Sequence, residues 1–237
     1  MSLPVYLELA QLRAWTEAEL EHRDLAANAI VACVKRSLSE ANRAWTFQRV
    51  EAPMLMPRAL MSAEYTDDDI WTTNVVLAEH AFALRAETTP STYATIRALY
   101  PRLEALKPPR CFWQVGKSFR REPQSSANRL RFFEFTQLEF QSLYSVDTKA
   151  DYRAMILDQV KDTLSWLCRS EARIVESDRL PSYSESTLDV EVRHRNDWRE
   201  VASISIRTDF EPFKNLEIAV GLDRIVAIAL DAPEHRI

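Results

Sequence analysis

The sequence predicts an α+β fold in which an antiparallel β-sheet is flanked by helices. Strand candidates dominate the middle of the chain, whereas helical patterns lie near its ends and between the strands. The 237 residues are 46% hydrophobic and 27% charged, values typical of a globular protein with a sizeable core. No internal repeat, low-complexity tract or linker divides the sequence, so we expect one domain over residues 1–237.

A long helix is expected near the start of the chain. Thr16 and Glu19 have the spacing of a capping box, and the apolar residues that follow recur at helical intervals to about Asn42. A strand is then predicted over Thr46–Glu51. It stops before Pro53, because proline has no amide hydrogen to donate to a sheet.

The rest of the chain alternates between the two patterns. A turn is expected around Pro57, and the acidic stretch Asp67–Asp69 is interpreted as a solvated loop. The remaining helices are expected over Pro90–Leu106, Asp147–Cys168 and Leu222–Leu230, and the remaining strands over Glu79–Glu87, Phe112–Glu122, Arg131–Leu143, Ala172–Glu176, Thr187–Arg193, Glu200–Arg207 and Leu216–Val220.

Charge and cysteine content argue against several classes of protein. The net charge is −5 and the 30 Lys and Arg residues are dispersed, which does not suit a general nucleic-acid binder. Cys33, Cys111 and Cys168 are widely spaced and the histidines lie far apart, so neither a disulfide framework nor a zinc site is predicted. No signal sequence or bilayer-length apolar run is visible. We therefore expect a cytoplasmic protein with no membrane partner.

Glycine is unusually scarce. Average usage predicts about 16 glycines in a chain of this length, whereas the sequence has two, Gly116 and Gly221. Each is a candidate for a backbone position that tolerates no Cβ.

The densest group of functional candidates lies in the segment SFRREPQSSANRLRFFEFTQLEF. If its two halves are paired strands, Arg120 and Glu122 share one face of the first, and Arg131, Phe135 and Glu139 share one face of the second. Guanidinium groups bind phosphate through charge-assisted hydrogen bonds, and an aromatic ring can stack on a base, so this set suits an adenine nucleotide. The residues alone leave open an amphipathic hairpin whose charged face is merely solvated, with Phe135 in the core.

The same segment resembles motif 2 of the class II aminoacyl-tRNA synthetases, at about residues 116–140, and is most similar to the glycyl enzymes. The string EIAVGLDRIVAIAL resembles motif 3, at about 216–231, and WTFQRVEAPMLMP resembles the end of motif 1, at about 18–53. LRAETTPSTY and WREVASISIRTDF resemble two further segments of these enzymes. The five matches occur in the family's order.

The resemblance implies ATP-binding roles for five residues. Arg120 would bind the α-phosphate, and Arg131 and Arg224 would bind the γ-phosphate or flank the base. Phe135 would stack on adenine, and Glu122 would help to place it. Arg120 and Arg224 are the implied catalytic residues, because catalysis in this family depends on alignment and electrostatic stabilisation and needs no nucleophilic side chain.

The resemblance also implies an amino-acid site. Glu87, Glu139 and Glu217 would surround the ammonium group of the substrate, with Arg85 beside them. The implied cofactors are ATP and Mg²⁺, and Glu217 is the candidate metal ligand. The resulting function is an AMP-forming ligase that activates a small, glycine-like amino acid as an aminoacyl-adenylate.

Some positions depart from the family pattern. Ala219 stands where glycyl enzymes usually have serine, Ala86 replaces the proline of their RPET segment, and Ala202–Ser203 replace usual glycines. Side chains at these positions would reshape the amino-acid pocket. No segment resembling an anticodon-binding domain is expected after motif 3.

The acceptor of the activated amino acid therefore stays open between tRNA and a non-tRNA molecule. A compact synthetase that reads only the acceptor stem of tRNA is one alternative, and a non-catalytic accessory or binding subunit with this fold is another. Because motif 1 builds a twofold dimer in this family, a homodimer through Ala18–Pro53 is also implied.

Overall fold

The computed structural model describes residues 14–61, 65–77, 80–121, 130–178 and 182–231 of the chain. Within these ranges the helices are α2 (Glu17–Ala41), α3 (Thr89–Leu99), α4 (Tyr152–Cys168) and α5 (Leu222–Leu230), with short 3₁₀ helices η1 (Arg58–Leu60) and η2 (Leu103–Leu106). The strands are β1 (Thr46–Arg49), β2 (Leu55–Pro57), β3 (Trp71–Leu77), β4 (His80–Leu84), β5 (Arg110–Phe119), β6 (Glu134–Ser145), β7 (Ala172–Glu176), β8 (Ser184–His194), β9 (Asp197–Arg207) and β10 (Phe213–Gly221). No helix of the described residues is long and apolar enough to cross a membrane.

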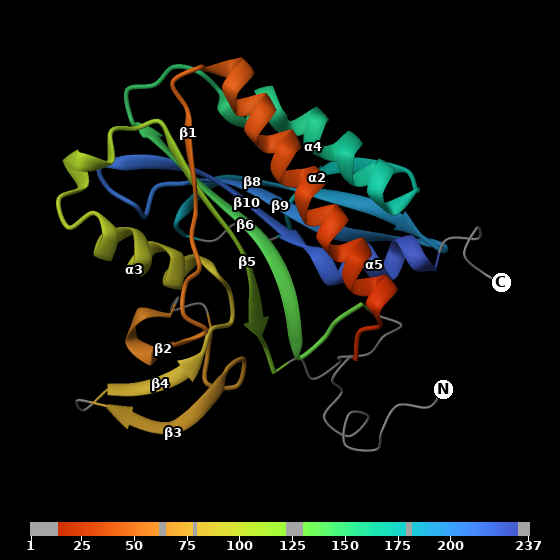
Figure 1. Ribbon diagram of the computed structural model, residues 1–237, viewed down its shortest axis with the longest axis horizontal. Helices are drawn as coiled ribbons and strands as arrows, with labels where there is room; N and C mark the ends of the chain where they lie inside the picture. The colour runs from red at the N-terminus through yellow and green to blue at the C-terminus, as the bar shows by residue number, and fades with distance from the viewer. Residues whose placement is uncertain (1–13, 62–64, 78–79, 122–129, 179–181, 232–237) are drawn as a thin grey trace.

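A seven-stranded sheet forms the centre of the molecule, with the strand order β1-β5-β6-β10-β9-β8-β7. Its neighbouring strands are antiparallel, except that β1 lies parallel to β5. Figure 1 shows α2, α4 and α5 across one face of this sheet, and α3 with the small sheet β2-β4-β3 beside it. The structure therefore agrees with the expected antiparallel sheet flanked by helices and adds one parallel pair.

The alternation of side chains along each strand divides core from cavity. On β10, Leu216, Ile218 and Val220 are fully buried against the helices. Glu217 and Ala219 lie between them in the sequence and face the other side, where they line a cavity. The same alternation holds on β8, β9 and the first part of β6, so the sheet packs a hydrophobic core on one face and presents polar side chains at the cavity on the other. Farther along that second face, Phe112 and Leu143 pack a smaller apolar cluster with Ile96 of α3.

The start of α2 confirms the capping box. The Thr16 hydroxyl accepts a hydrogen bond from the Glu19 amide at 3.3 Å, and the Glu19 carboxylate accepts one from the Thr16 amide at 2.8 Å. The predicted bounds of β7 and α5 agree with the structure, and α4 begins five residues later than expected, at Tyr152. Asp151 is its N-cap, accepting a hydrogen bond from the Ala154 amide at 3.0 Å.

Several elements are shorter than the sequence indicated, among them β1, which ends at Arg49, and β4, which spans His80–Leu84. Two further differences have a clear local cause. Helix α3 ends at Leu99 instead of Leu106, because Tyr100 precedes Pro101 and adopts a non-helical conformation. Strand β6 begins at Glu134 instead of Arg131, because Leu130 has a positive φ of 54° and the chain is still turning there.

Of the small sheet, only β4 was predicted, as part of the strand expected over Glu79–Glu87. Its strand β2 includes Pro57, which was interpreted as a turn, and β3 follows directly after the acidic stretch Asp67–Asp69. Pro57 is tolerated because it closes β2, and β2 lies at the edge of the sheet.

Candidate functional site

A cavity of about 230 Å³ opens on the polar face of the seven-stranded sheet. Strands β6, β8, β9 and β10 contribute to it, together with Arg120 just after β5, the first turn of α5 and the segment before α3. Seven residues that the sequence analysis assigned to a single site line this cavity: Glu87, Arg120, Arg131, Phe135, Glu139, Glu217 and Arg224. Glu122, which was assigned to the same site, lies outside the described residues.

Arg120 follows the last residue of β5 and is held from two directions. Its Nε donates a hydrogen bond to the Ala86 carbonyl at 3.0 Å, and its backbone amide donates one to the Phe133 carbonyl at 2.9 Å. The guanidinium carbon lies 5.2 Å from the ring centroid of Phe135 and 5.4 Å from that of Tyr65. The cation is therefore packed between two aromatic rings, which restrict its motion at the cavity wall.

Arg224 lines the cavity from the first turn of α5, the helix that begins directly after Gly221. Its Nε donates a hydrogen bond to the Leu130 carbonyl at 3.3 Å. Burial lowers the pKa of this guanidinium, and the Glu200 carboxylate opposes that effect. The positive charges of Arg131 and Arg120 lower the pKa further, which shows that the three cations share one electrostatic environment.

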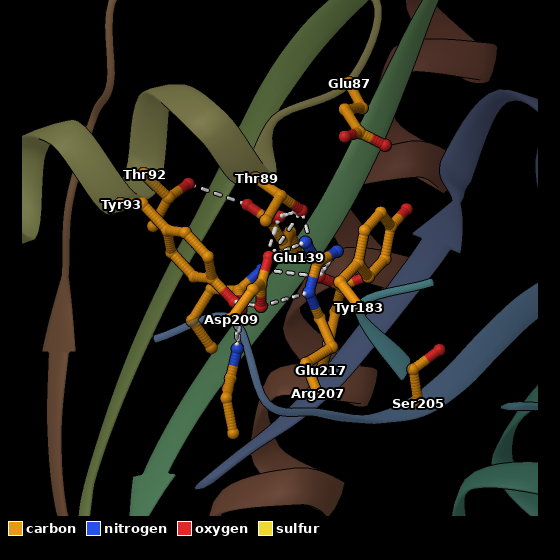
Figure 2. Close-up of polar contacts among 12 residues, drawn as sticks. Glu87, Thr89, Thr92, Tyr93, Glu139, Tyr183, Ser205, Arg207, Asp209 and Glu217 are labelled. Carbon is orange, nitrogen blue, oxygen red and sulfur yellow. Dashed lines mark hydrogen bonds and ion pairs between the residues drawn. The ribbon is translucent and has the colours of Figure 1, made fainter. Parts of the chain in front are cut away.

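Two carboxylates lie at the centre of a hydrogen-bond network on β6 and β10 (Figure 2). Glu139 is 1% exposed and Glu217 is largely buried. The Thr89 hydroxyl contacts a carboxylate oxygen of each. Gln141 Nε2 donates to Glu139 at 2.7 Å and to Glu217 at 3.0 Å. Burial raises the pKa of Glu139, and the negative charge of Glu217 raises it further.

Glu87 lies apart from this network, as Figure 2 shows. The Tyr65 hydroxyl donates a hydrogen bond to Glu87 Oε2 at 3.3 Å. Glu87 Oε1 is buried and has no hydrogen-bond partner among the described residues. Burial, followed by the charge of Glu217, raises the pKa of Glu87 to about 7. An acceptor oxygen that is buried without a donor is suited to a ligand that brings one.

Arg207 is the main functional candidate that sequence reasoning missed. It is 3% exposed, and its guanidinium contacts Glu217 at 2.8 Å and Asp209 at 2.5 Å. Burial disfavours the charged form, but Glu217 and the hydrogen bond to Asp209 raise the pKa above its ordinary value. The available signal was the alternation in VASISIR, where Arg207 follows Ser203 and Ser205 on the polar face of the strand.

Arg85 does not line this cavity. It is 1% exposed, and its guanidinium donates hydrogen bonds to the Lys117 carbonyl at 2.7 Å, the Ala52 carbonyl at 2.9 Å and the Ser91 hydroxyl at 2.9 Å. The sequence analysis placed it at the amino acid, whereas the structure uses its donors to join β5 to the segment after β1.

The two glycines differ in what they require. A Cβ at Gly116 would lie 2.2 Å from an Arg85 nitrogen, so this position needs glycine. A Cβ at Gly221 would meet nothing closer than 3.8 Å, and the expectation that this position tolerates no side chain is wrong.

The positions that depart from the family pattern fall on both sides of the sheet. Ala219 and Ser203 line the cavity, whereas Ala202 is buried in the core on the opposite face. Ala86 is fully buried and supplies the carbonyl that holds Arg120. Side chains at Ala219 and Ser203 can therefore reshape the cavity directly, and the expectation that Ala202 does so is wrong.

Strands β8 and β9 add hydroxyl groups to the cavity lining. The hydroxyls of Thr187 and Ser205 lie 3.0 Å apart, and Ser203 is on the same face. Asp189 lies among them, and burial raises its pKa while hydrogen bonds from Ser177 and Ser203 oppose the rise. Sequence reasoning did not identify this group, because serine and threonine are common on exposed strands.

The described residues contain no group of three or more His, Cys, Asp or Glu side chains that could hold a metal ion. Glu217 Oε2 already accepts hydrogen bonds from Thr89, Gln141 and Arg207. The protein therefore offers Mg²⁺ a single partly engaged carboxylate at the expected position.

Comparison with known proteins places this geometry in context. No family model matches the chain. The glycine–tRNA ligase of Mycobacterium bovis is 31% identical over 115 residues, covering 44% of this chain and 24% of the relative. The glycine–tRNA ligase of Lachnoclostridium phytofermentans is 30% identical over 138 residues, which cover 56% of this chain and 30% of the relative. The chain thus spans less than a third of the length of these curated relatives.

Solved structures show the same fold. The prolyl-tRNA synthetase of Cryptosporidium parvum, complexed with halofuginone and AMPPNP, matches 85% of this chain and 45% of its own with a TM-score of 0.65 and 12% identity. The Giardia lamblia prolyl-tRNA synthetase in complex with prolyl-adenylate matches 86% of this chain and 45% of its own, with a TM-score of 0.64 and 15% identity. The predicted fold, a mostly antiparallel sheet flanked by helices as in class II synthetase catalytic cores, is confirmed.

Proposed function

We propose that this class II synthetase-like core, which is related in sequence to glycine–tRNA ligases, uses ATP to convert a small amino acid into an aminoacyl-adenylate. The observation that carries the proposal is the convergence of three guanidinium groups, an aromatic ring and three carboxylates on one cavity. Such a set complements the polyphosphate, the base and the ammonium group of the two substrates. The aminoacyl group would then pass to tRNA or to another acceptor.

The arginines would serve the phosphates. We assign Arg120, which is held by the Ala86 carbonyl and two aromatic rings, to the α-phosphate, where negative charge grows as the amino-acid carboxylate attacks. Arg131 and Arg224 would hold the γ-phosphate or flank the base. Phe135, packed beside the Arg120 guanidinium, would stack on adenine. Because these cations repel one another, an anionic ligand among them would relieve the repulsion.

The carboxylates would serve the ammonium group. Glu139 and Glu217 share two hydrogen-bond donors, and Glu87, whose Oε1 is buried without a partner among the described residues, lines the same cavity. A cation placed among them favours the ionised forms that burial disfavours.

Mg²⁺ fits this site mainly through the nucleotide. It commonly binds one or two carboxylates together with substrate phosphates, and it would neutralise part of the phosphate charge when bound. Glu217 is the residue that we assign to it. The arginines supply the remaining positive charge.

The test is amino-acid-dependent exchange of pyrophosphate into ATP, measured for all twenty amino acids. We expect exchange with glycine or another small amino acid, and its loss in Arg120→Ala. The matched control is Arg173→Ala, which removes an exposed guanidinium on β7 at the far edge of the sheet and should retain exchange.

Absence of exchange by the folded wild type with every amino acid would overturn the proposal. A titration with millimolar ATP then separates the alternatives. Absence of binding would favour a non-catalytic module of this fold, whereas binding without exchange would leave a nucleotide-binding protein that does not activate amino acids.

A further inference from the structure

A second cavity, of about 450 Å³, lies next to the first. Three residues line both cavities: Glu87, Thr89 and Tyr183. They form the boundary between the two spaces at the end of the first cavity where the carboxylates gather. Beyond this boundary the second cavity is lined partly by apolar side chains, Leu60, Met61, Pro90, Tyr93 and Ala94.

Tyr183 is the large side chain in this boundary, and the structure holds it firmly. Its ring centroid lies 3.8 Å from the guanidinium carbon of Arg207. Arg207 is fixed by ion pairs to Glu217 and Asp209. The backbone carbonyl of Tyr183 accepts a hydrogen bond from the Thr208 amide at 3.0 Å. Figure 2 shows the ring beside Arg207.

The other two boundary residues have polar tasks. Glu87 contributes a carboxylate to the lining of both cavities, and Thr89 contacts both carboxylates of the network. Neither fills space as a phenol ring does. Removing the Tyr183 ring would therefore join the two cavities while leaving the carboxylates and the arginines in place.

We propose that Tyr183 sets the size limit for the side chain of the amino-acid substrate. This inference rests on the proposed function. With the ring present, an amino acid whose ammonium group lies among the carboxylates meets a rigid wall and must have a small side chain. Without the ring, the space lined by Met61 and Ala94 becomes available to a longer apolar side chain such as that of leucine or methionine.

The test compares pyrophosphate exchange with glycine, alanine, methionine and leucine in Tyr183→Ala and Tyr183→Phe. We expect Tyr183→Ala to raise kcat/KM for methionine or leucine, relative to the preferred small amino acid, by a factor of about 10 or more, since each methylene in an apolar pocket contributes roughly tenfold or more. Tyr183→Phe keeps the ring and should keep the wild-type preference. If Tyr183→Ala does not fold, Tyr183→Leu carries the same test with a smaller opening.

A second substitution checks that the new space is the adjoining cavity. Ala94→Leu adds a side chain to the far wall, so it should cancel the gain in the Tyr183→Ala background and leave the preference unchanged by itself. If the wild type is active and the folded Tyr183→Ala variant keeps the same amino-acid preference, the role of Tyr183 is overturned and the proposed function is not affected. Absence of exchange by the wild type with every amino acid overturns the proposed function and this assignment with it.

Discussion

Glu139 and Glu217 accept hydrogen bonds from the same two side chains, Thr89 and Gln141, although they belong to different strands. Their register makes this possible, because Ala219 is paired with Glu139 and Glu217 with Gln141 across β10 and β6. The two carboxylates are therefore one electrostatic unit. A change of charge at either one alters the other and the arginine that pairs with Glu217.

Arg207→Met tests how much the buried arginine beside Glu139 and Glu217 contributes to the stability of the fold. The substitution keeps an unbranched side chain but leaves Glu217 and Asp209 without their partner, so we expect a loss of about 3 kcal/mol in the free energy of unfolding. Arg173→Met removes an exposed partner of Glu191 and should cost less than about 1 kcal/mol. Urea denaturation measures both. Equal losses in the two variants would contradict a special role for the buried pair.

Glu87 should make stability depend on pH in a defined window. Its pKa is raised from 4.5 to about 7 in the folded protein, so the folded state binds more protons than the unfolded state between these values. The contribution of Glu87 is fully present below pH 4.5 and is lost as pH rises through about 7.

The variant that isolates this effect is Glu87→Gln. The free energy of unfolding of the wild type, minus that of the variant, should fall by up to about 3 kcal/mol between pH 4.5 and 7 and then level off. Chemical denaturation at pH 5, 6, 7 and 8 checks the sign. A difference that rises with pH would show that Glu87 is ionised in the folded protein throughout.

Gly116→Ala should destabilise the fold by about 1–3 kcal/mol, because the new Cβ would overlap the buried Arg85 guanidinium. Gly221→Ala is the matched control. Its φ of −81° suits alanine and its nearest neighbour is 3.8 Å away, so the loss should stay below about 1 kcal/mol. Thermal or urea unfolding measures the pair. A larger loss for Gly221→Ala than for Gly116→Ala would show that the requirement for glycine lies at the start of α5 and not at the Arg85 contact.

Arg224→Ala should weaken ATP binding by roughly 10-fold or more, since a hydrogen bond to a charged group contributes about 1.5–3 kcal/mol. Arg131→Ala should have a smaller effect, because Arg131 is exposed and its interaction with phosphate is screened by solvent. Isothermal titration of each variant with ATP gives the comparison. An Arg224→Ala variant with wild-type affinity would remove Arg224 from the nucleotide site.

Local sequence patterns predicted the features that depend on neighbouring residues, namely helix capping and the alternation of side chains along strands. The capping residues placed the start of α2, and strand alternation placed Phe135 and Glu139 on the face that lines the cavity. Arg131 reaches the same cavity by a different route. It precedes β6 and follows the positive-φ residue Leu130, so its position comes from a turn and not from the strand that the alternation argument assumed.

The features that sequence reasoning missed depend on contacts between distant segments. Arg207 has its partners at Glu217, on another strand, and at Tyr183, more than twenty residues earlier. Nothing in the segment around Arg207 signals either of them. Arg85 shows the opposite case. Its position in a family-like string suggested a ligand contact, whereas Gly116 leaves room for it to bind backbone carbonyls instead.

The two-faced strands allow part of the cavity lining to change without disturbing the core. Ser203, Ser205 and Ala219 can each be exchanged without touching Ile204, Ile218 or Val220, which lie on the helix-covered side. Glu217 is the exception, because it is paired with the buried Arg207. A lineage carrying this sheet can therefore acquire a different ligand through single substitutions at every second position. Inserting or deleting one residue in β10 would instead exchange its two faces, placing isoleucine in the cavity and glutamate under the helices.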